Sequence, residues 1–219
     1  INFPVSASEM FEVKLTGGGS REVDLSAGSS VAEWTVRVLN QGNTADVFTI
    51  TWDDTGIPAG WTLNVESMET PSINWGGFYE FNVVLNVPSD ALAGTSFTFS
   101  MDVVSNGNST QTAAQDFTAT VNQHYGVSLS VDSASKENKP SQSVDFIFNI
   151  TNTGNGEDSF SISAEGPSVW NPVLSQDNIT IGAVSGSQFT LTVTIPSDRD
   201  AGANSGDIVV TVLSSDDES

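Results

Sequence analysis

The sequence predicts an all-β protein made of two β-sandwich domains in tandem, and three observations support this prediction. Apolar residues alternate with polar ones over many short segments, which is the pattern of strands with one buried face. Gly, Asn, Ser and Pro separate these segments, and nothing reads as a long helix. Finally, the second half of the chain repeats the plan of the first, so the same fold is expected twice.

The clearest repeat is a thirteen-residue stretch at positions 40–52, which recurs 112 residues later at positions 152–164. Asn, Gly, Asn, Asp, Phe and Ile are identical at matching places. We expect a turn in which Gly42 has a positive φ, followed by a strand that points Phe48 and Ile50 inward. Because both copies keep the turn formers and the apolar pair, the stretch is predicted to be a fold-determining corner.

The first domain is expected to cover residues 1–123, with an extra strand at its N-terminus. Its strands are predicted, in chain order, at residues 1–7, 11–15, 20–25, 34–38, 48–52, 61–65, 79–87, 97–103 and 117–121. Pro4 confines the first of these to a sheet edge. Residues 106–109, with the sequence Asn-Gly-Asn-Ser, predict a hairpin turn before the last strand.

The second domain, residues 124–219, follows the same plan with one exception. Alternating segments recur at residues 127–131, 146–150, 160–162, 189–195 and 208–212. A final strand equivalent to residues 117–121 is missing. We therefore expect a second sandwich that is either completed by other material or cut short.

The strand order matches seven-stranded immunoglobulin-like sandwiches. The first copy of a recurring motif comprises Asn40, Gly42, Asn43, Asp46, Phe48, Ile50, Gly60, Trp61, Pro88, Ser89, Asp90, Ala93 and Gly94. The second comprises Asn152, Gly154, Asn155, Asp158, Phe160, Ile162, Trp170, Pro196, Ser197, Asp198, Ala201 and Gly202, with Val169 replacing the glycine before the tryptophan. This motif resembles the CARDB-type and related immunoglobulin-like domains of prokaryotic surface proteins. The resemblance implies extracellular spacers, adhesion or envelope proteins, or accessory domains of secreted hydrolases.

Composition narrows the functional classes. With 27 acidic and 6 basic residues the net charge is −21, which repels phosphate backbones and anionic membranes, so we expect no nucleic-acid partner. Absence of cysteine excludes a disulfide framework. No run approaches the ~20 apolar residues of a membrane span, so no membrane insertion is expected. The scarcity of Lys favours a saline habitat, and we expect an extracellular, cell-surface location and an archaeal source.

Catalysis is not expected. The single histidine, His124, lies at the domain boundary, and no serine elbow or cysteine accompanies it. Acidic residues are the hard ligands that calcium prefers, so calcium is the one candidate cofactor. The candidate ligands are Asp198, Asp200 and Asp207, with Asp53 and Asp54 as a weaker set. None has the spacing of an EF-hand loop, and turn formation or a solvated face explains them equally well.

Three rings have small counterparts in the second copy: Trp52, Trp75 and Tyr79. Exposed on one face, they would stack on sugars. All three are in phase with inward neighbours, however, so a larger core in the first domain is favoured. Three sequons place candidate glycosylation sites at Asn108, Asn149 and Asn178.

The function predicted from these observations is that of a non-enzymatic extracellular structural or adhesive protein, a spacer or a subunit of a surface layer or filament. Its expected partners are other copies of itself, other surface proteins and glycans. A sharper version has Ile1, Phe3 and Val5 of one subunit completing the second sandwich of the next by β-strand addition. The alternative is a carbohydrate-binding accessory module of a larger secreted hydrolase.

Overall fold

The protein is all-β. The computed structural model describes residues 2–26 and 30–217. The chain divides into two compact units, residues 1–122 and 123–219, each of which is a sandwich of two sheets. None of the helical segments in the described ranges has the length and hydrophobicity needed to span a bilayer.

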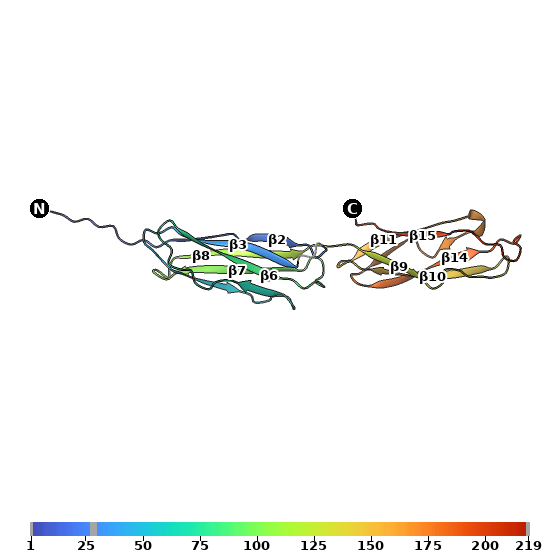
Figure 1. The fold of residues 1–219 in the computed structure, drawn as a ribbon, viewed down its shortest axis with the longest axis horizontal. Coiled ribbons are helices and arrows are strands. Elements are labelled where there is room, and N and C mark those ends of the chain that lie inside the picture. Colours follow the sequence, from blue (N-terminus) through green and yellow to red (C-terminus); the bar gives the residue numbers. More distant parts are fainter. Residues whose placement is uncertain (1, 27–29, 218–219) are drawn as a thin grey trace. The chain divides into compact units, whose positions relative to one another are not determined.

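The first unit pairs two four-stranded sheets (Figure 1). Its strands are β1 (Val13–Thr16), β2 (Gly19–Val23), β3 (Val31–Asn40), β4 (Phe48–Asp53), β5 (Thr62–Val65), β6 (Phe78–Asn86), β7 (Ser96–Ser105) and β8 (Thr112–Val121). One sheet has the order β1-β3-β6-β5 and the other β2-β8-β7-β4. All pairs are antiparallel except β2 with β8. This is the strand order of an immunoglobulin-like sandwich, which confirms the predicted fold class.

Strict alternation in the long strands fills the core of the first unit. In β3 the inward positions are buried and the outward ones are exposed, as the period of two requires. Trp34 packs edge-on against Phe99 and Phe117, at centroid distances of 5.8 and 5.6 Å. Phe99 and Phe117 stack on each other at 5.0 Å. The last strand, β8, therefore supplies a central aromatic ring of this core.

The second unit repeats the arrangement with fewer strands. They are β9 (Val127–Val131), β10 (Ser143–Asn152), β11 (Asp158–Glu165), β12 (Val173–Leu174), β13 (Asn178–Ile181), β14 (Gly186–Thr194) and β15 (Val209–Ser214), with one 3-10 turn, η1 (Ser168–Trp170). One sheet has the order β12-β14-β10-β9, and the other is the three-stranded β13-β11-β15. No strand equivalent to β2 or β8 occurs within its described residues.

The repeated corner works differently from the prediction. Asn40 donates from Nδ2 to the carbonyls of Thr44 and Ile73, both at 2.8 Å, and its Oδ1 accepts from the N–H of Gly42. The prediction of a positive φ at Gly42 is wrong. A Cβ at Gly42 would lie 2.3 Å from the carbonyl oxygen of Met10, so glycine is required by close approach of the entering chain.

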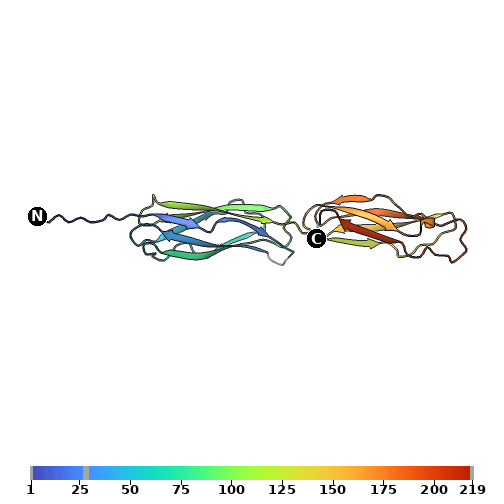
Figure 2. The ribbon, with the colours of Figure 1, turned by 90° about the horizontal axis from the view of Figure 1, so that it is seen from above.

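The segment before the first sandwich also departs from the prediction. Residues 2–12 form no strand, and Phe3 and Val5 are 81% and 95% exposed. Figures 1 and 2 show this segment projecting from the sandwich as a single length of chain. The predicted half-buried strand is wrong for residues 2–7, because none of the described strands lies beside them to accept their backbone hydrogen bonds. Ile1 lies outside the described residues.

Candidate functional site

Strand β15 has an open edge. Its partner is β11, with Phe160 opposite Ser214, just as Phe48 of β4 lies opposite Ser105 of β7. Strand β7, however, also pairs along its other edge with β8. Among residues 123–217 nothing pairs with the corresponding edge of β15. Ser214 is therefore equivalent to Ser105. Counting back from these two serines along β15 and β7 aligns Ile208, Val210 and Val212 with Phe99, Met101 and Val103.

The core of the second sandwich is exposed along this edge. Val210 and Val212 are only half-buried, whereas Met101 and Val103 are fully buried. The inward positions of β10 show the same contrast with β3: Phe146 is half-buried, but its counterpart Trp34 is 1% exposed. Because β2 and β8 cover these positions in the first sandwich, the difference follows from the strands that the second one lacks.

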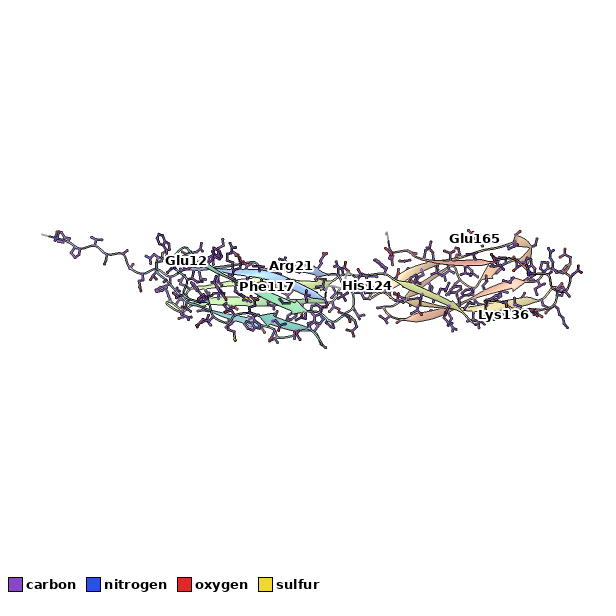
Figure 3. The ribbon with its side chains drawn as sticks, in the orientation of Figure 1. Glu12, Arg21, Phe117, His124, Lys136 and Glu165 are labelled. Carbon is purple, nitrogen blue, oxygen red and sulfur yellow. The ribbon has the colours of Figure 1, made fainter. Side chains whose placement is uncertain are left out.

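An apolar groove results. It has a volume of about 1090 Å³, and its floor includes Phe146, Phe148, Trp170, Val193 and Ile208. Two loops, residues 133–140 and 199–207, form its walls. In the first sandwich the corresponding space holds Phe117, labelled in Figure 3, whose buried ring packs against Trp34 and Phe99. The groove therefore has the position and the chemical character of a site for a β-strand that carries an aromatic residue.

A buried carboxylate marks the same incompleteness at one end of β15. In the first sandwich Asp46 accepts hydrogen bonds from the Ser105 hydroxyl and from the N–H of Gly107, in the turn between β7 and β8. In the second, Asp158 is 1% exposed and its Oδ1 accepts from the Ser214 hydroxyl at 2.9 Å. Its Oδ2 is buried and has no partner in the described part of the chain. The corner thus lacks the contact that a turn into a further strand would add.

Basic residues gather at the groove. Lys136, Lys139 and Arg199 line it, and they are three of the six basic residues of the chain. Lys136 is labelled on the second unit in Figure 3. Its Nζ donates a hydrogen bond to the Asp132 carboxylate at 2.5 Å. This hydrogen bond lowers the pKa of Asp132. Glu137, Asp200 and Asp207 also line the groove, so its basic and acidic residues balance in a protein whose net charge is −21.

The calcium candidates do not converge. Asp198 lies 3.6 Å from the Arg199 guanidinium, while Asp200 and Asp207 line the groove. In a turn of the first unit, hydrogen bonds from the side chain of Thr55 and from its N–H lower the pKa of Asp53, and Asp54 follows it. Nowhere in the described ranges do three acidic or histidine side chains come close enough to hold a metal ion.

The predicted stacking residues do not share one face. Trp75 is 72% exposed in a turn, so its predicted inward orientation is wrong. Tyr79 is half-buried in β6 and stacks on Phe81 at 6.1 Å, whereas Trp52 packs against the core from β4, in the other sheet. One exposed ring does not form the flat platform that sugar stacking requires.

The remaining candidates lie apart from the groove. His124 is half-buried, its backbone N–H donates to Asn155, and its Nδ1 has no partner among the described residues. Of the sequon residues, Asn149 and Asn178 are exposed and Asn108 is half-buried in the β7–β8 turn. Sequence reasoning singled out Asp200 and Asp207, though as calcium ligands, and missed the other groove-lining residues of the two loops. The signal available for them was the absence of a last strand, which predicts an open edge but not its lining.

No protein-family model matches the chain, and no curated protein matches it. Several solved structures resemble it weakly. CBD12 from CALX1.2 is 13% identical, with a TM-score of 0.40 over 83% of this chain and 75% of that chain. The secreted serine protease VesC from Vibrio cholerae is 9% identical, with a TM-score of 0.38 over 93% of this chain and 50% of that chain.

The YadV chaperone is 11% identical, with a TM-score of 0.33 over 93% of this chain and 92% of that chain. This chain thus spans half the length of the VesC chain and most of the YadV chain. Similarities at these identities and TM-scores are too weak to carry an argument about function. The function must be argued from the groove itself.

Proposed function

We propose that this chain is a non-enzymatic extracellular subunit that assembles by β-strand addition. The groove of its second sandwich receives the N-terminal segment of another copy. The observation that carries the proposal is the open apolar groove at the start of β15, beside the edge that β8 covers in the first sandwich. Main-chain hydrogen bonds to the open edge at the start of β15, and to the chain that leads into it, would supply affinity, and inward side chains would supply specificity.

The N-terminal segment has the properties of a donor strand. Residues 2–7 pair with no strand among the described residues, and Phe3 and Val5 expose nearly all of their surface. Asn43 anchors the chain behind this segment, since it accepts from the N–H of Met10 and donates to the carbonyl of Ser8. Residues 2–8 include no charged side chain in a protein of net charge −21. Burial of this segment therefore removes apolar surface from water without a charge penalty.

Each copy offers one donor segment and one groove. Addition of the donor of one copy to the groove of the next is a heterologous contact, which extends into an open series of subunits. A filament or surface layer is the expected product. The acidic surface and the resemblance to surface-protein domains support an extracellular location. The carbohydrate-binding alternative is not proposed, because its three rings lie on different faces.

Sedimentation velocity of the 219-residue chain tests this function. We expect oligomers whose size grows with protein concentration up to about 100 µM, a range that covers micromolar affinity. A variant without residues 1–7 is expected to remain monomeric. It is also expected to shorten the oligomers of the intact chain, because its groove binds the donor segment of an intact copy while it has no donor segment to bind the next groove. A monomeric intact chain, or a deletion variant that assembles equally well, would contradict the proposal.

The other occupant to consider is a strand of the same polypeptide that follows residue 219 in a longer protein. Such a strand would fill the groove within the chain and exclude a second copy. Microscopy of native material separates the two occupants, because only addition between subunits makes density continuous from the N-terminal segment of one copy into the second sandwich of another.

A further inference from the structure

We infer the register of the added strand, an inference that rests on the proposed function: Phe3 of the donor lies opposite Ile208, in the space that Phe117 fills in the first sandwich. Val5 and Ala7 then continue inward toward the two loops, and Asn2 lies opposite Val209. The donor runs antiparallel to β15, as β8 runs to β7.

The first sandwich provides the template. Phe117 is opposite Phe99 in the β7–β8 ladder, and Asp116 is opposite Ser100. Because Ser214 occupies the place of Ser105, the position of Phe99 is that of Ile208. Phe117 also packs edge-on against Trp34, whose counterpart is Phe146 in the floor of the groove. Ile208 is smaller than its counterpart Phe99, and Phe146 is smaller than its counterpart Trp34. The two residues therefore leave room for an aromatic ring between them.

The donor sequence matches the strand that it would replace. Residues 117–121 read Phe-Thr-Ala-Thr-Val, and residues 3–7 read Phe-Pro-Val-Ser-Ala. Both begin with Phe, and both have one Ala and one Val at the two following inward positions, in opposite order. A hydroxyl residue, Thr120 or Ser6, separates those two positions in each segment. The inward side chains of the two segments therefore have the same total volume, which a packed core rewards.

Pro4 fits this orientation. In β8 the N–H of Val121 donates to the Thr95 carbonyl, on the β7 side, while the N–H of Asn122 donates to the Val23 carbonyl, on the β2 side. Since N–H directions alternate along a strand, Phe117 and Ala119 face β7 and Thr118 faces β2. Pro4 takes the place of Thr118. Its missing N–H would point away from β15, where no described residue of the second unit forms a strand like β2.

Disulfide trapping between two copies tests the register. Because the sequence contains no cysteine, only the introduced cysteines can form a disulfide. A chain carrying Asn2→Cys is mixed with a chain carrying Val209→Cys. We expect this pair to cross-link at least about tenfold faster than Asn2→Cys with Thr211→Cys, which would require a slip of two residues. Equal rates, or a faster reaction of the slipped pair, would overturn the inferred register.

Proline placement gives a second, independent readout. Pro4→Ala is expected to change the dissociation constant of assembly by less than about threefold, because no hydrogen bond is gained toward β15. Val5→Pro is expected to weaken assembly by about 100-fold, since the N–H of Val5 faces Gly206, in the chain that leads into β15. A tolerated Val5→Pro together with a damaging Pro4→Ala would mean that the donor lies with its opposite face inward.

These outcomes separate the inference from the function on which it rests. If the intact chain assembles and deletion of residues 1–7 abolishes assembly, the proposed function stands whatever the cross-links show. A slipped or reversed cross-linking pattern then refutes the register alone. If the intact chain does not assemble, the function and the register fail together.

Discussion

At the scale of single residues, the repeated corner clamps the chain as it enters each sandwich. Asn155 repeats the role of Asn43, since its Oδ1 accepts from the N–H of His124 as that of Asn43 accepts from Met10. Gly154 lies under the same crossing, because a Cβ there would be 2.4 Å from the carbonyl oxygen of His124. The motif shared by both halves thus fixes the path of the chain where it enters each sandwich.

Gly154→Ala should therefore destabilise the second unit by about 1–3 kcal/mol, because the crossing backbone must shift to make room. Gly182→Ala is the matched control in the same unit: no atom lies within 4 Å of its Cβ position, so its effect should stay within about 1 kcal/mol. Urea unfolding of both variants measures the difference. Equal stabilities would show that the crossing relaxes without cost.

The pair formed by Asp132 and Lys136 yields a prediction about pH. The hydrogen bond from the Lys136 ammonium lowers the pKa of the exposed Asp132 carboxyl. Its contribution to stability is present above the pKa that aspartate has in the unfolded chain, and is lost as pH falls through the lower folded-state value. In Lys136→Met the pKa of Asp132 should rise toward its ordinary value. NMR titration of the Asp132 carboxyl checks this, with an unchanged pKa as the contrary result.

For single residues, the sequence predicted burial correctly where the two-residue period of a strand determines it. The predictions were wrong where contacts with residues distant in sequence, or a turn, determine the conformation. The alternation that placed Trp34 and Phe48 inward is a property of strands, and both are buried. Gly42 was assigned a positive φ because glycine often has one, but its reason is a close contact with a residue distant in sequence. Trp75 is in phase with inward neighbours yet lies in a turn, where the period no longer applies.

At the scale of elements, β8 is what separates a closed sandwich from an open one. Phe117 contributes the ring that stacks on Phe99 and meets Trp34, and it is fully buried. Phe117→Ala should destabilise the first unit by about 3–5 kcal/mol. Thr118→Ala, on the outward face of the same strand, should cost less than about 1 kcal/mol. Calorimetry of both variants tests whether β8 stabilises the fold mainly through this ring.

Occupation of the groove should stabilise the element that it covers. A peptide of residues 2–10, added to the variant without residues 1–7, is expected to slow amide hydrogen exchange at Ile208, just before β15, because Phe3 lies opposite it. At a concentration of 100 times its dissociation constant, such a ligand stabilises the folded state by about 2.7 kcal/mol. The same peptide with Phe3→Ala serves as the control. Slowed exchange with both peptides would show that the ring does not anchor the strand.

Most strands could be predicted from the sequence, and so could the lack of a last strand in the second domain. These are consequences of alternation and of comparison between the two copies. The groove as a site could not be predicted, because its walls at residues 133–140 and 199–207 are loops that are distant in sequence and have no periodic pattern. The same limit applies to the predicted strand at residues 1–7: alternation identified a strand-like segment, but not that residues 2–7 pair with no strand in the described part of their own domain.

At the scale of the whole molecule, charge opposes the assembly that the groove permits. Two copies with a net charge of −21 each repel one another, while the contact itself is apolar on the donor side. Salt shortens the range of this repulsion from about 10 Å at 0.1 M to about 3 Å at 1 M ionic strength. Burial of Phe3 and Val5, by contrast, does not weaken with added salt.

Assembly should therefore tighten as sodium chloride rises from 0.1 to 1 M, with a dissociation constant that falls at least about threefold. The basic residues Lys136, Lys139 and Arg199 make the opposite result informative. If they bound acidic residues of the donor chain such as Glu9, salt would weaken assembly instead. Sedimentation across the salt series decides between the two results. The Phe3→Ala variant controls for non-specific association. If salt promotes assembly through the groove, this variant should form no oligomers at high salt, because it lacks the ring that the groove binds.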